Sequence, residues 1–476
     1  MRKTKIICTL GPACHSEEML EKMVRAGMNV ARLNFSHGSH EEHGERIAMI
    51  RAVRERLEVP LAVMLDTKGP EIRLREFEGG CATLHDGEPF TLTTEEVLGD
   101  GDRASITYRD LPKELHGGET ILIDDGKLEL QVASCTDREI HCTVVHGGVV
   151  RNRKSINVPR SRLSLPYLSE QDKADLLFGI QQDVDYVAAS FTRCREDVVA
   201  LRKFLDYNGG HSIRIIAKIE NIEGVENFNE ILRVADGIMV ARGDMGVEIE
   251  YERLPGLQKR FIRRCHQAGK VVITATQMLD SMIVHAHPTR AEITDVANAV
   301  FDGTSAVMLS GETAAGKFPV EAVQVMANIA QQAEKDAVEM LAYRDIRYDT
   351  ELDDNTNAVC DAACTMARDI RAKAIIALTK YGHTARRMSK FRPVQPIVAA
   401  THVRKTYHQL GMCWGVYPVM SRYQQSTEDL LLHAVDCAKQ IDAVEDGDLV
   451  VIAAGVPLDT PGSTNLLKVE VVGARS

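Results

Sequence analysis

Six short strand-like segments end in polar or charged residues that could bind ions or oxyanions. Their ends are Arg32-Leu33-Asn34-Phe35-Ser36, Asp66-Thr67-Lys68, Lys218-Ile219-Glu220, Arg242-Gly243-Asp244, Thr276-Gln277 and Ser310-Gly311-Glu312. Charge at one strand end is ordinary. Its repetition along the chain predicts that these ends meet on a shared working face, as strand ends do in parallel α/β folds.

Lys218 and Glu220 are two residues apart on a predicted strand, so both side chains leave the same face. Together with Asp244 they could hold a hard divalent cation and an oxyanion. Mg²⁺ takes one or two carboxylates and fills its shell with water and substrate oxygens, and a lysine beside it could neutralise a phosphate or enolate oxygen. The alternative is a structural ion pair, but Asp244 and Arg32 favour the site.

Two further polar groups each allow two interpretations. Asn34, Ser36, Asp66 and Thr67 are oxygen donors with one full charge between them, which suits a monovalent cation or a hydrogen-bonded cap on two strands. Thr276, Ser310 and Glu312 could relay a proton, or could simply be satisfied polar groups at strand ends.

Other motifs are expected to have no role in chemistry. His37, His40 and His43 recur every three residues, but we expect a solvated turn rather than a metal site. Cys360 and Cys364 share one helix face and should pack in a core.

The elements that carry these residues alternate between β-branched runs and helical patterns, which predicts βα units on a parallel sheet. The predicted strands are 5–8, 29–34, 61–66, 185–191, 213–219, 237–242, 271–276 and 306–309. Eight such units predict a closed (β/α)₈ TIM barrel over residues 1–69 and 169–342. An open, doubly wound sheet is the alternative.

Two further domains are predicted. Residues 70–168 are rich in Gly, Thr and Asp with short alternating runs, which predicts a small inserted antiparallel β-barrel that could act as a lid. After the polar segment 343–357, residues up to 476 alternate again and predict a C-terminal open α/β domain.

Composition excludes several classes of protein. Lys plus Arg number 57 and Asp plus Glu 68, for a net charge of −11, and aromatic residues make up 5%, so nucleic acid is not expected as a partner. No apolar run has the length of a bilayer span, and the start lacks a secretory signal, so no membrane association is expected. The 11 scattered cysteines include no Cys-x-x-Cys pair, which predicts a reduced, cytoplasmic location.

Long motifs in register across nearly the whole chain resemble the pyruvate kinase family. They are residues 31–38 (ARLNFSHG), 65–73 (LDTKGPEIR), 217–221 (AKIEN), 241–244 (ARGD), 275–279 (ATQML), 288–292 (PTRAE), 295–298 (DVAN) and 308–313 (MLSGET). The resemblance implies transfer of the phosphoryl group of phosphoenolpyruvate to ADP, giving pyruvate and ATP in the last step of glycolysis. An enolate stabilised by Mg²⁺ and Lys218 would form on the way.

The resemblance also implies roles for individual residues. Lys218 would contact the phosphoryl group, Glu220 and Asp244 would bind Mg²⁺, and Glu71 matches members that require K⁺. The other implied sets are Asn34, Ser36, Asp66 and Thr67 for K⁺; Arg32, Lys218, Gly243, Asp244 and Thr276 for phosphoenolpyruvate; Asn34, Arg73 and Lys154 for the nucleotide; and Thr276, Ser310 and Glu312 for the proton route.

The C-terminal domain resembles the family's effector domain. Its loop Thr379, Lys380, Tyr381, Gly382, His383 and Thr384 would hold a sugar phosphate or AMP, although a small hydroxyl residue is frequent where Tyr381 stands. A homotetramer is also implied. Two other functions remain possible from the sequence. One is an Mg²⁺-dependent, enolate-forming aldolase, which would not need Arg73 and Lys154. The other is a catalytically inactive homologue that senses a metabolite, which would be expected to lack Lys218, Glu220 or Asp244.

Overall fold

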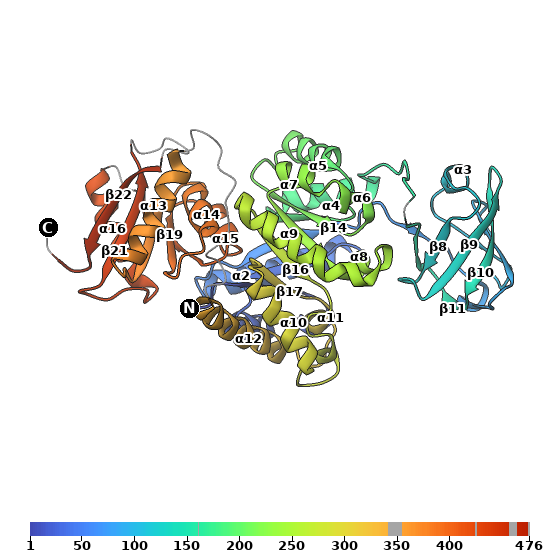
Figure 1. Ribbon diagram of the computed structural model, residues 1–476, viewed down its shortest axis with the longest axis horizontal. Coiled ribbons are helices and arrows are strands. Elements are labelled where there is room, and N and C mark those ends of the chain that lie inside the picture. The colour runs from blue at the N-terminus through green and yellow to red at the C-terminus, as the bar shows by residue number, and fades with distance from the viewer. Residues whose placement is uncertain (160, 341–354, 424–425, 457–463, 475–476) are drawn as a thin grey trace.

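A computed structural model describes residues 1–159, 161–340, 355–423, 426–456 and 464–474. Three bodies lie in a row, with the α/β barrel in the middle (Figure 1). The inserted domain extends from one side of the barrel, and the C-terminal domain packs against the other. In the described ranges, no helix combines the length and apolar character needed to cross a membrane.

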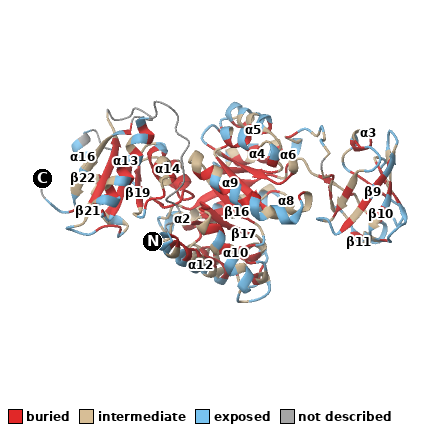
Figure 2. Cartoon of the chain, viewed as in Figure 1, coloured by how far each residue is buried: buried red, intermediate tan, exposed pale blue. Residues whose placement is uncertain are grey.

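The central body is a closed barrel of eight parallel strands, which confirms the predicted TIM barrel. Around the barrel the strand order is β1-β17-β16-β15-β14-β13-β3-β2. Their bounds are β1 (Lys5–Thr9), β2 (Val30–Asn34), β3 (Ala62–Asp66), β13 (Tyr186–Ala189), β14 (Arg214–Ile219), β15 (Gly237–Ala241), β16 (Val271–Ala275) and β17 (Ala306–Leu309). Every strand is almost wholly buried (Figure 2), because apolar side chains fill the interior and helices cover the outside.

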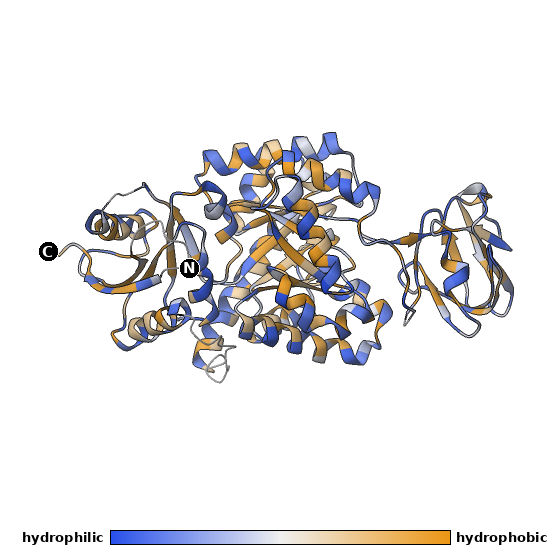
Figure 3. Cartoon of the chain, turned by 90° about the horizontal axis from the view of Figure 1, so that it is seen from above, coloured by the Kyte–Doolittle hydropathy of each residue, from blue (hydrophilic) through white to orange (hydrophobic). Residues whose placement is uncertain are grey.

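The covering helices turn apolar faces to the strands and polar faces outward (Figure 3). They are α1 (Glu17–Ala26), α2 (His40–Arg56), α4 (Glu170–Gln181), α5 (Arg195–Tyr207), α7 (Phe228–Val234), α9 (Leu254–Ala268), α10 (Arg290–Phe301) and α12 (Pro319–Glu339). Ser169 caps α4 by accepting from the amide of Asp172, as predicted.

Three short helices follow strand ends directly and were not predicted. They are α6 (Ile222–Glu226), α8 (Arg242–Glu248) and α11 (Gly311–Ala314). With seven residues at most, each is too short to show helical periodicity. The described parts of the barrel and the inserted domain also contain the 3₁₀ turns η1 (Pro12–Cys14), η2 (Glu78–Gly80), η3 (Tyr251–Arg253) and η4 (Asp280–Ile283).

The inserted domain is a seven-stranded sheet with its own apolar core. The sheet order is β4 (Ile72–Arg73), β12 (Ser155–Asn157), β8 (Thr120–Ile123), β9 (Leu128–Cys135), β10 (Glu139–His146), β6 (Pro89–Thr93) and β7 (Arg103–Ser105). A bridge between Leu74 and Ile106 joins its two edges, which closes the sheet into the predicted barrel. The pairing is antiparallel except between β6 and β7, which are parallel, contrary to the prediction. β5 (Cys81–Leu84), β11 (Gly148–Arg151) and α3 (Leu111–Glu114) complete the domain.

The C-terminal domain is the predicted open α/β sheet, in the order β20 (Val416–Met420), β19 (Ile397–Thr401), β18 (Ala374–Leu378), β21 (Leu449–Gly455) and β22 (Thr464–Val471). Only β22 is antiparallel. The helices are α13 (Asn355–Asp369), α14 (His383–Lys390), α15 (Arg404–Leu410) and α16 (Thr427–Gln440). Cys360 and Cys364 are buried in its core, as predicted. Most of the polar segment 343–357 lies outside the described residues.

Candidate active site

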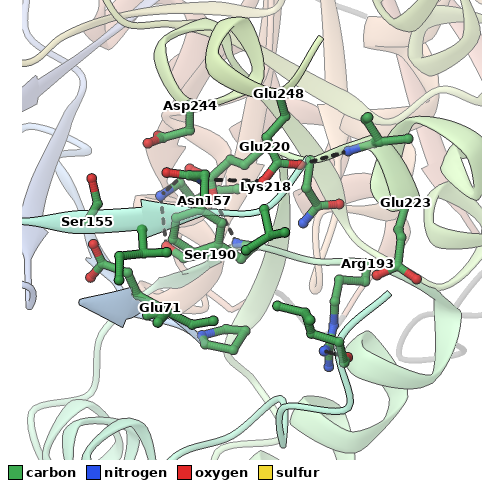
Figure 4. Close-up of a pocket in the computed structure, with 18 of the residues that line it drawn as sticks. Glu71, Ser155, Asn157, Ser190, Arg193, Lys218, Glu220, Glu223, Asp244 and Glu248 are labelled. Atoms are coloured by element: carbon green, nitrogen blue, oxygen red, sulfur yellow. Dashed lines mark hydrogen bonds and ion pairs between the residues drawn. The ribbon is translucent and has the colours of Figure 1, made fainter. Parts of the chain in front are cut away.

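A cleft of about 860 Å³ lies where the carboxyl ends of the barrel strands face the inserted domain. Lys218, Glu220 and Asp244 line the barrel side of this cleft, and Glu71 and Ser155 line it from the segment entering the insert and from β12 (Figure 4). Four of the six strand ends singled out from the sequence, 32–36, 66–68, 218–220 and 242–244, therefore contribute to one cleft, because parallel barrel strands all end on one face.

Lys218 is the centre of a buried polar group. Its Nζ donates to Ser190 Oγ at 2.7 Å and to Asp66 Oδ1 at 3.0 Å, and Glu220 Oε1 lies 3.0 Å from the same nitrogen. Burial alone would lower the pKa of Lys218, but the charges of Asp66 and Glu220 outweigh it and raise the pKa above its ordinary value. Lys218 is therefore a fixed cation at the mouth of the barrel.

Arg32 forms an ion pair with the second carboxylate oxygen of Asp66. Its Nε lies 2.6 Å from Asp66 Oδ2, and its Nη1 donates to Thr9 Oγ1 at 2.8 Å. Burial opposes ionisation of Asp66, but Arg32 and Lys218 lower its pKa below the ordinary value. Two cations that line the cleft thus share one buried carboxylate, which fixes both of them in place.

Glu220 and Asp244 stand on neighbouring strand ends. Burial raises the pKa of the Glu220 carboxyl to about 7; the charge of Lys218 opposes this shift and that of Asp244 adds to it. Within the described ranges, the Asp244 side chain has no hydrogen-bond or ion-pair partner, although it lines the cleft. Two carboxylates of which one is unpartnered match the small protein donor set of Mg²⁺, and a cation there would stabilise both charges.

No group of three or more His, Cys, Asp or Glu side chains in the described part of the chain could hold a metal ion by itself. A cation at Glu220 and Asp244 would therefore need ligands from water or substrate, as Mg²⁺ commonly has.

The four oxygen donors proposed for a monovalent cation lie at or just beyond the ends of the neighbouring strands β2 and β3. Asn34 and Asp66 are direct partners in the parallel pairing of these strands. The Asn34 side chain accepts from the amide of Ser36 at 3.1 Å, and Thr67 Oγ1 accepts from the amide of Ser190 at 3.1 Å. These donors fit a weakly charged oxygen site, and the same hydrogen bonds also cap the strands.

Thr276, Ser310, Glu312 and Gly243 do not line the cleft, although all four were predicted to belong to the site. Thr276 has a positive φ of 67°, which is strained for a β-branched residue, and its Oγ1 accepts from the amide of Gly243 at 2.9 Å. Glu312 accepts from the amides of Leu279 and Ser310 at 3.0 and 2.7 Å. The buried Ser310 Oγ has no hydrogen-bond partner among the described residues.

The inserted domain and the segment leading into it supply the basic residues proposed for the nucleotide. Arg73 forms a bidentate ion pair with Glu71, with Nε 2.8 Å from Oε2 and Nη2 2.7 Å from Oε1. Lys154 Nζ lies 2.7 Å from Asp124 Oδ1. Both cations line the same cleft as Lys218.

Two residues of this region were missed in the sequence. Ser190 follows a strand whose end carries no charge, so nothing marked it, yet its hydroxyl joins Lys218 to Asp66 and lies 3.1 Å from Asp66 Oδ1. Glu248 lies one helical turn beyond Asp244, on the unpredicted helix α8. Burial raises the pKa of Glu248 to about 7.

The prediction of a solvated histidine turn is wrong for His43. Its ring is buried, stacks on Phe35 with centroids 4.0 Å apart, and contacts the carbonyl of His37 at 2.8 Å. His40 contacts Asp175 at 2.6 Å, and His37 is exposed. The side chains of His40 and His43 bond to different residues, so the three histidines do not form a metal site.

The loop proposed for an effector joins β18 to α14 in the C-terminal domain, far from the cleft. Gly382 has φ +80° and donates its amide to Thr379 Oγ1 at 3.0 Å. Arg386 donates to the carbonyl of Tyr381, whose ring is exposed. Thr384 Oγ1 lies 2.7 Å from Thr464 Oγ1, so its hydroxyl faces inward.

Comparison with known proteins identifies the family. The models "Pyruvate kinase, barrel domain" and "Pyruvate kinase, alpha/beta domain" match residues 1–323 and 357–470. The pyruvate kinase of Clostridium acetobutylicum is 49% identical over 473 residues, which cover 99% of this chain and all of the relative. That of Staphylococcus haemolyticus is 49% identical over 477 residues, covering 99% of this chain and 81% of the relative. A solved pyruvate kinase from Cryptosporidium parvum superimposes with a TM-score of 0.93 at 41% identity, covering 99% of this chain and 96% of that one. The chain therefore belongs to the pyruvate kinase family.

Proposed function

We propose that the cleft transfers the phosphoryl group of phosphoenolpyruvate to ADP, the reaction of the family, through the residues described above. The observation that carries this proposal is the buried Lys218 ammonium, held by Asp66, Ser190 and Glu220 at a cleft that Arg73 and Lys154 of the inserted domain also line. An aldolase would not need Arg73 and Lys154, and a relative without catalytic activity would not need to keep the cluster around Lys218.

Phosphoryl transfer asks the protein mainly for positioning and charge neutralisation. Phosphoenolpyruvate would bind against Arg32, Lys218, Gly243, Asp244 and Thr276. The ADP phosphates would contact Arg73, Lys154 and Asn34. The bond from phosphorus to the enol oxygen breaks as a bond to the terminal ADP oxygen forms, and Lys218 offsets negative charge on the oxygens between them.

The departing group is the enolate of pyruvate, which needs one proton at carbon 3. Lys218 offsets the charge of the enolate oxygen until that proton arrives. Thr276 is the proposed donor, with Ser310 and Glu312 behind it, or a water beside them. The inserted domain would shield the reacting atoms from water, which matters because hydrolysis competes with transfer.

Two cations belong to this proposal. Glu220 and Asp244 would hold Mg²⁺, which supplies Lewis-acid charge to phosphoryl and carboxylate oxygens when bound. Asn34, Ser36, Asp66 and Thr67 would hold K⁺, with Glu71 as the residue that makes K⁺ necessary. The site thus depends on both ions for its charge balance.

The direct test is pyruvate formation from phosphoenolpyruvate and ADP with Mg²⁺, in K⁺ buffer and in K⁺-free buffer. We expect activity that requires K⁺ and is lost in Lys218→Met. Folded protein that makes no pyruvate under any of these conditions, even with sugar phosphates or AMP added, would refute the proposal.

We also propose the domain limits 1–69 with 169–342, 70–168 and 343–476; the limit at 342 lies outside the described residues. A cytoplasmic homotetramer is expected, and sedimentation velocity tests the assembly. The loop 379–384 is proposed to bind a sugar phosphate or AMP. A change in the half-saturating phosphoenolpyruvate concentration on adding either compound would support that site, and no change would argue against it.

A further inference from the structure

Helix α8 carries two acidic residues that point to different parts of the active site. Asp244 lies in its first turn and Glu248 is its last residue, so the two are four positions apart and lie along one side of the helix. Asp244 lines the cleft without a partner, whereas the Glu248 carboxylate is hydrogen-bonded (Figure 4).

The Glu248 carboxylate bonds to two segments, β12 of the inserted domain and the start of α6. Its Oε1 accepts from Asn157 Nδ2 at 3.3 Å, and its Oε2 accepts from the amide of Ile222 at 3.3 Å. Ile222 is two residues beyond Glu220 at the start of α6. In the described part of the chain, the bond from Asn157 is the one hydrogen bond between a strand of the inserted sheet and the barrel.

The segment that Asn157 belongs to also carries the proposed nucleotide contacts. Asn157 ends β12, which Lys154 directly precedes, and Ser155 of the same strand pairs with Arg73. The inserted domain meets α8 at a second point, since a Cβ built on Gly126 would lie 3.7 Å from Val247. One short helix thus contacts the nucleotide wall at its end and presents a proposed metal ligand at its start.

We propose that Glu248 is a positioning residue that couples nucleotide binding at the inserted domain to cation binding at Glu220 and Asp244. Its carboxylate fixes α8, the segment after Glu220 and β12 relative to one another, so a ligand that orders one of them favours the ordered form of the others. Such coupling acts equally in both directions. The inference rests on the function proposed above.

The test uses Glu248→Gln and Asn157→Ala in the full-length protein. Glutamine keeps the size of the side chain but is neutral and has a donor NH₂ group in place of one carboxylate oxygen, so Asn157 and Ile222 can no longer each donate to a separate carboxylate oxygen. Asn157→Ala removes the other end of the inter-domain bond and leaves the carboxylate in place. Steady-state kinetics give KM for ADP and for phosphoenolpyruvate, and Mn²⁺ binding followed by the electron spin resonance of the free ion gives cation affinity without turnover.

We expect Glu248→Gln to raise KM for ADP and the Mn²⁺ Kd by about tenfold each, the effect of losing a hydrogen bond to a charged group. KM for phosphoenolpyruvate should change less than twofold. Asn157→Ala should raise KM for ADP by about tenfold, and the double variant should resemble Glu248→Gln rather than show a hundredfold effect, because both changes break one link.

Glu223→Gln is the matched control, because Glu223 is a carboxylate that also lines the cleft. Its contact with the inserted domain is an ion pair at 3.7 Å with the exposed Arg162, outside the described strands of that domain. This variant should leave KM for ADP and the Mn²⁺ Kd within twofold of wild type. An equal effect of Glu223→Gln would overturn the inference in favour of simple charge loss, and so would additive effects of Glu248→Gln and Asn157→Ala. Unchanged KM for ADP in folded Asn157→Ala would overturn it even if Glu248→Gln failed to fold. Wild-type protein that made no pyruvate would refute the proposed function instead.

Discussion

Ser190→Ala tests whether the position of Lys218, and not only its charge, supports catalysis. Ser190 is 2% exposed, and its hydroxyl accepts from Lys218 Nζ at 2.7 Å. The same oxygen lies 2.5 Å from the carbonyl of Thr67 and 3.1 Å from Asp66 Oδ1. Alanine removes this contact, while Asp66 and Glu220 still hold the charge of the ammonium.

The size of the effect follows from the kind of bond that is lost. A hydrogen bond to a charged group contributes about 1.5–3 kcal/mol, and about 1.4 kcal/mol corresponds to a factor of ten in rate. If the contact is kept through the transition state, kcat/KM for phosphoenolpyruvate should fall by roughly 10- to 150-fold. Lys218→Met, which removes the charge itself, should cost more.

The assay is steady-state pyruvate formation at saturating ADP, Mg²⁺ and K⁺, with thermal unfolding as a check on folding. Thr192→Val is the control, because Thr192 Oγ1 donates to the carbonyl of Ala189 at 2.9 Å and does not contact Lys218. It should lose stability but keep kcat/KM within about threefold, as no charged partner is lost. Folded Ser190→Ala with wild-type kcat/KM would refute this account of Lys218.

Three further predictions concern pH, domain packing and K⁺. Burial lowers the pKa of Lys5 from 10.5 to about 7. Between these two pH values the folded state binds fewer protons than the unfolded state, so the unfolding free energy should rise with pH. In denaturant titrations the unfolding free energy of wild type should increase relative to that of Lys5→Met between about pH 7 and 9, and a constant difference would contradict this. In Gly411→Ala the new Cβ would lie 2.3 Å from the Pro60 carbonyl, which should cost about 1–3 kcal/mol in calorimetry, whereas Gly256→Ala, with nothing within 4 Å, should not destabilise. Glu71→Lys should bring activity in K⁺-free buffer close to that in K⁺, because the ammonium supplies a fixed positive charge; full K⁺ dependence in this variant would disprove the role given to Glu71.

Much of the fold could be predicted because apolar runs and helical patterns alternate with clear spacing. The eight barrel strands and the open C-terminal sheet depend on this local pattern, and their closure and order follow from parallel pairing. Helices α6, α8 and α11 could not be predicted, since a few residues carry no periodic signal. The parallel pair β6 and β7 depends on how the inserted sheet closes, which no local pattern encodes.

The sequence by itself determined which charged residues stand at strand ends, and therefore that Lys218, Glu220 and Asp244 share one face. Side-chain spacing on a strand and the common direction of parallel strands are enough for that. Only the tertiary structure decided that the neutral Ser190 joins Lys218 to Asp66, that His43 is buried, and that Glu248 reaches Asn157. These contacts join residues from different elements, so their distances arise from packing between elements and leave no trace in the spacing along the chain.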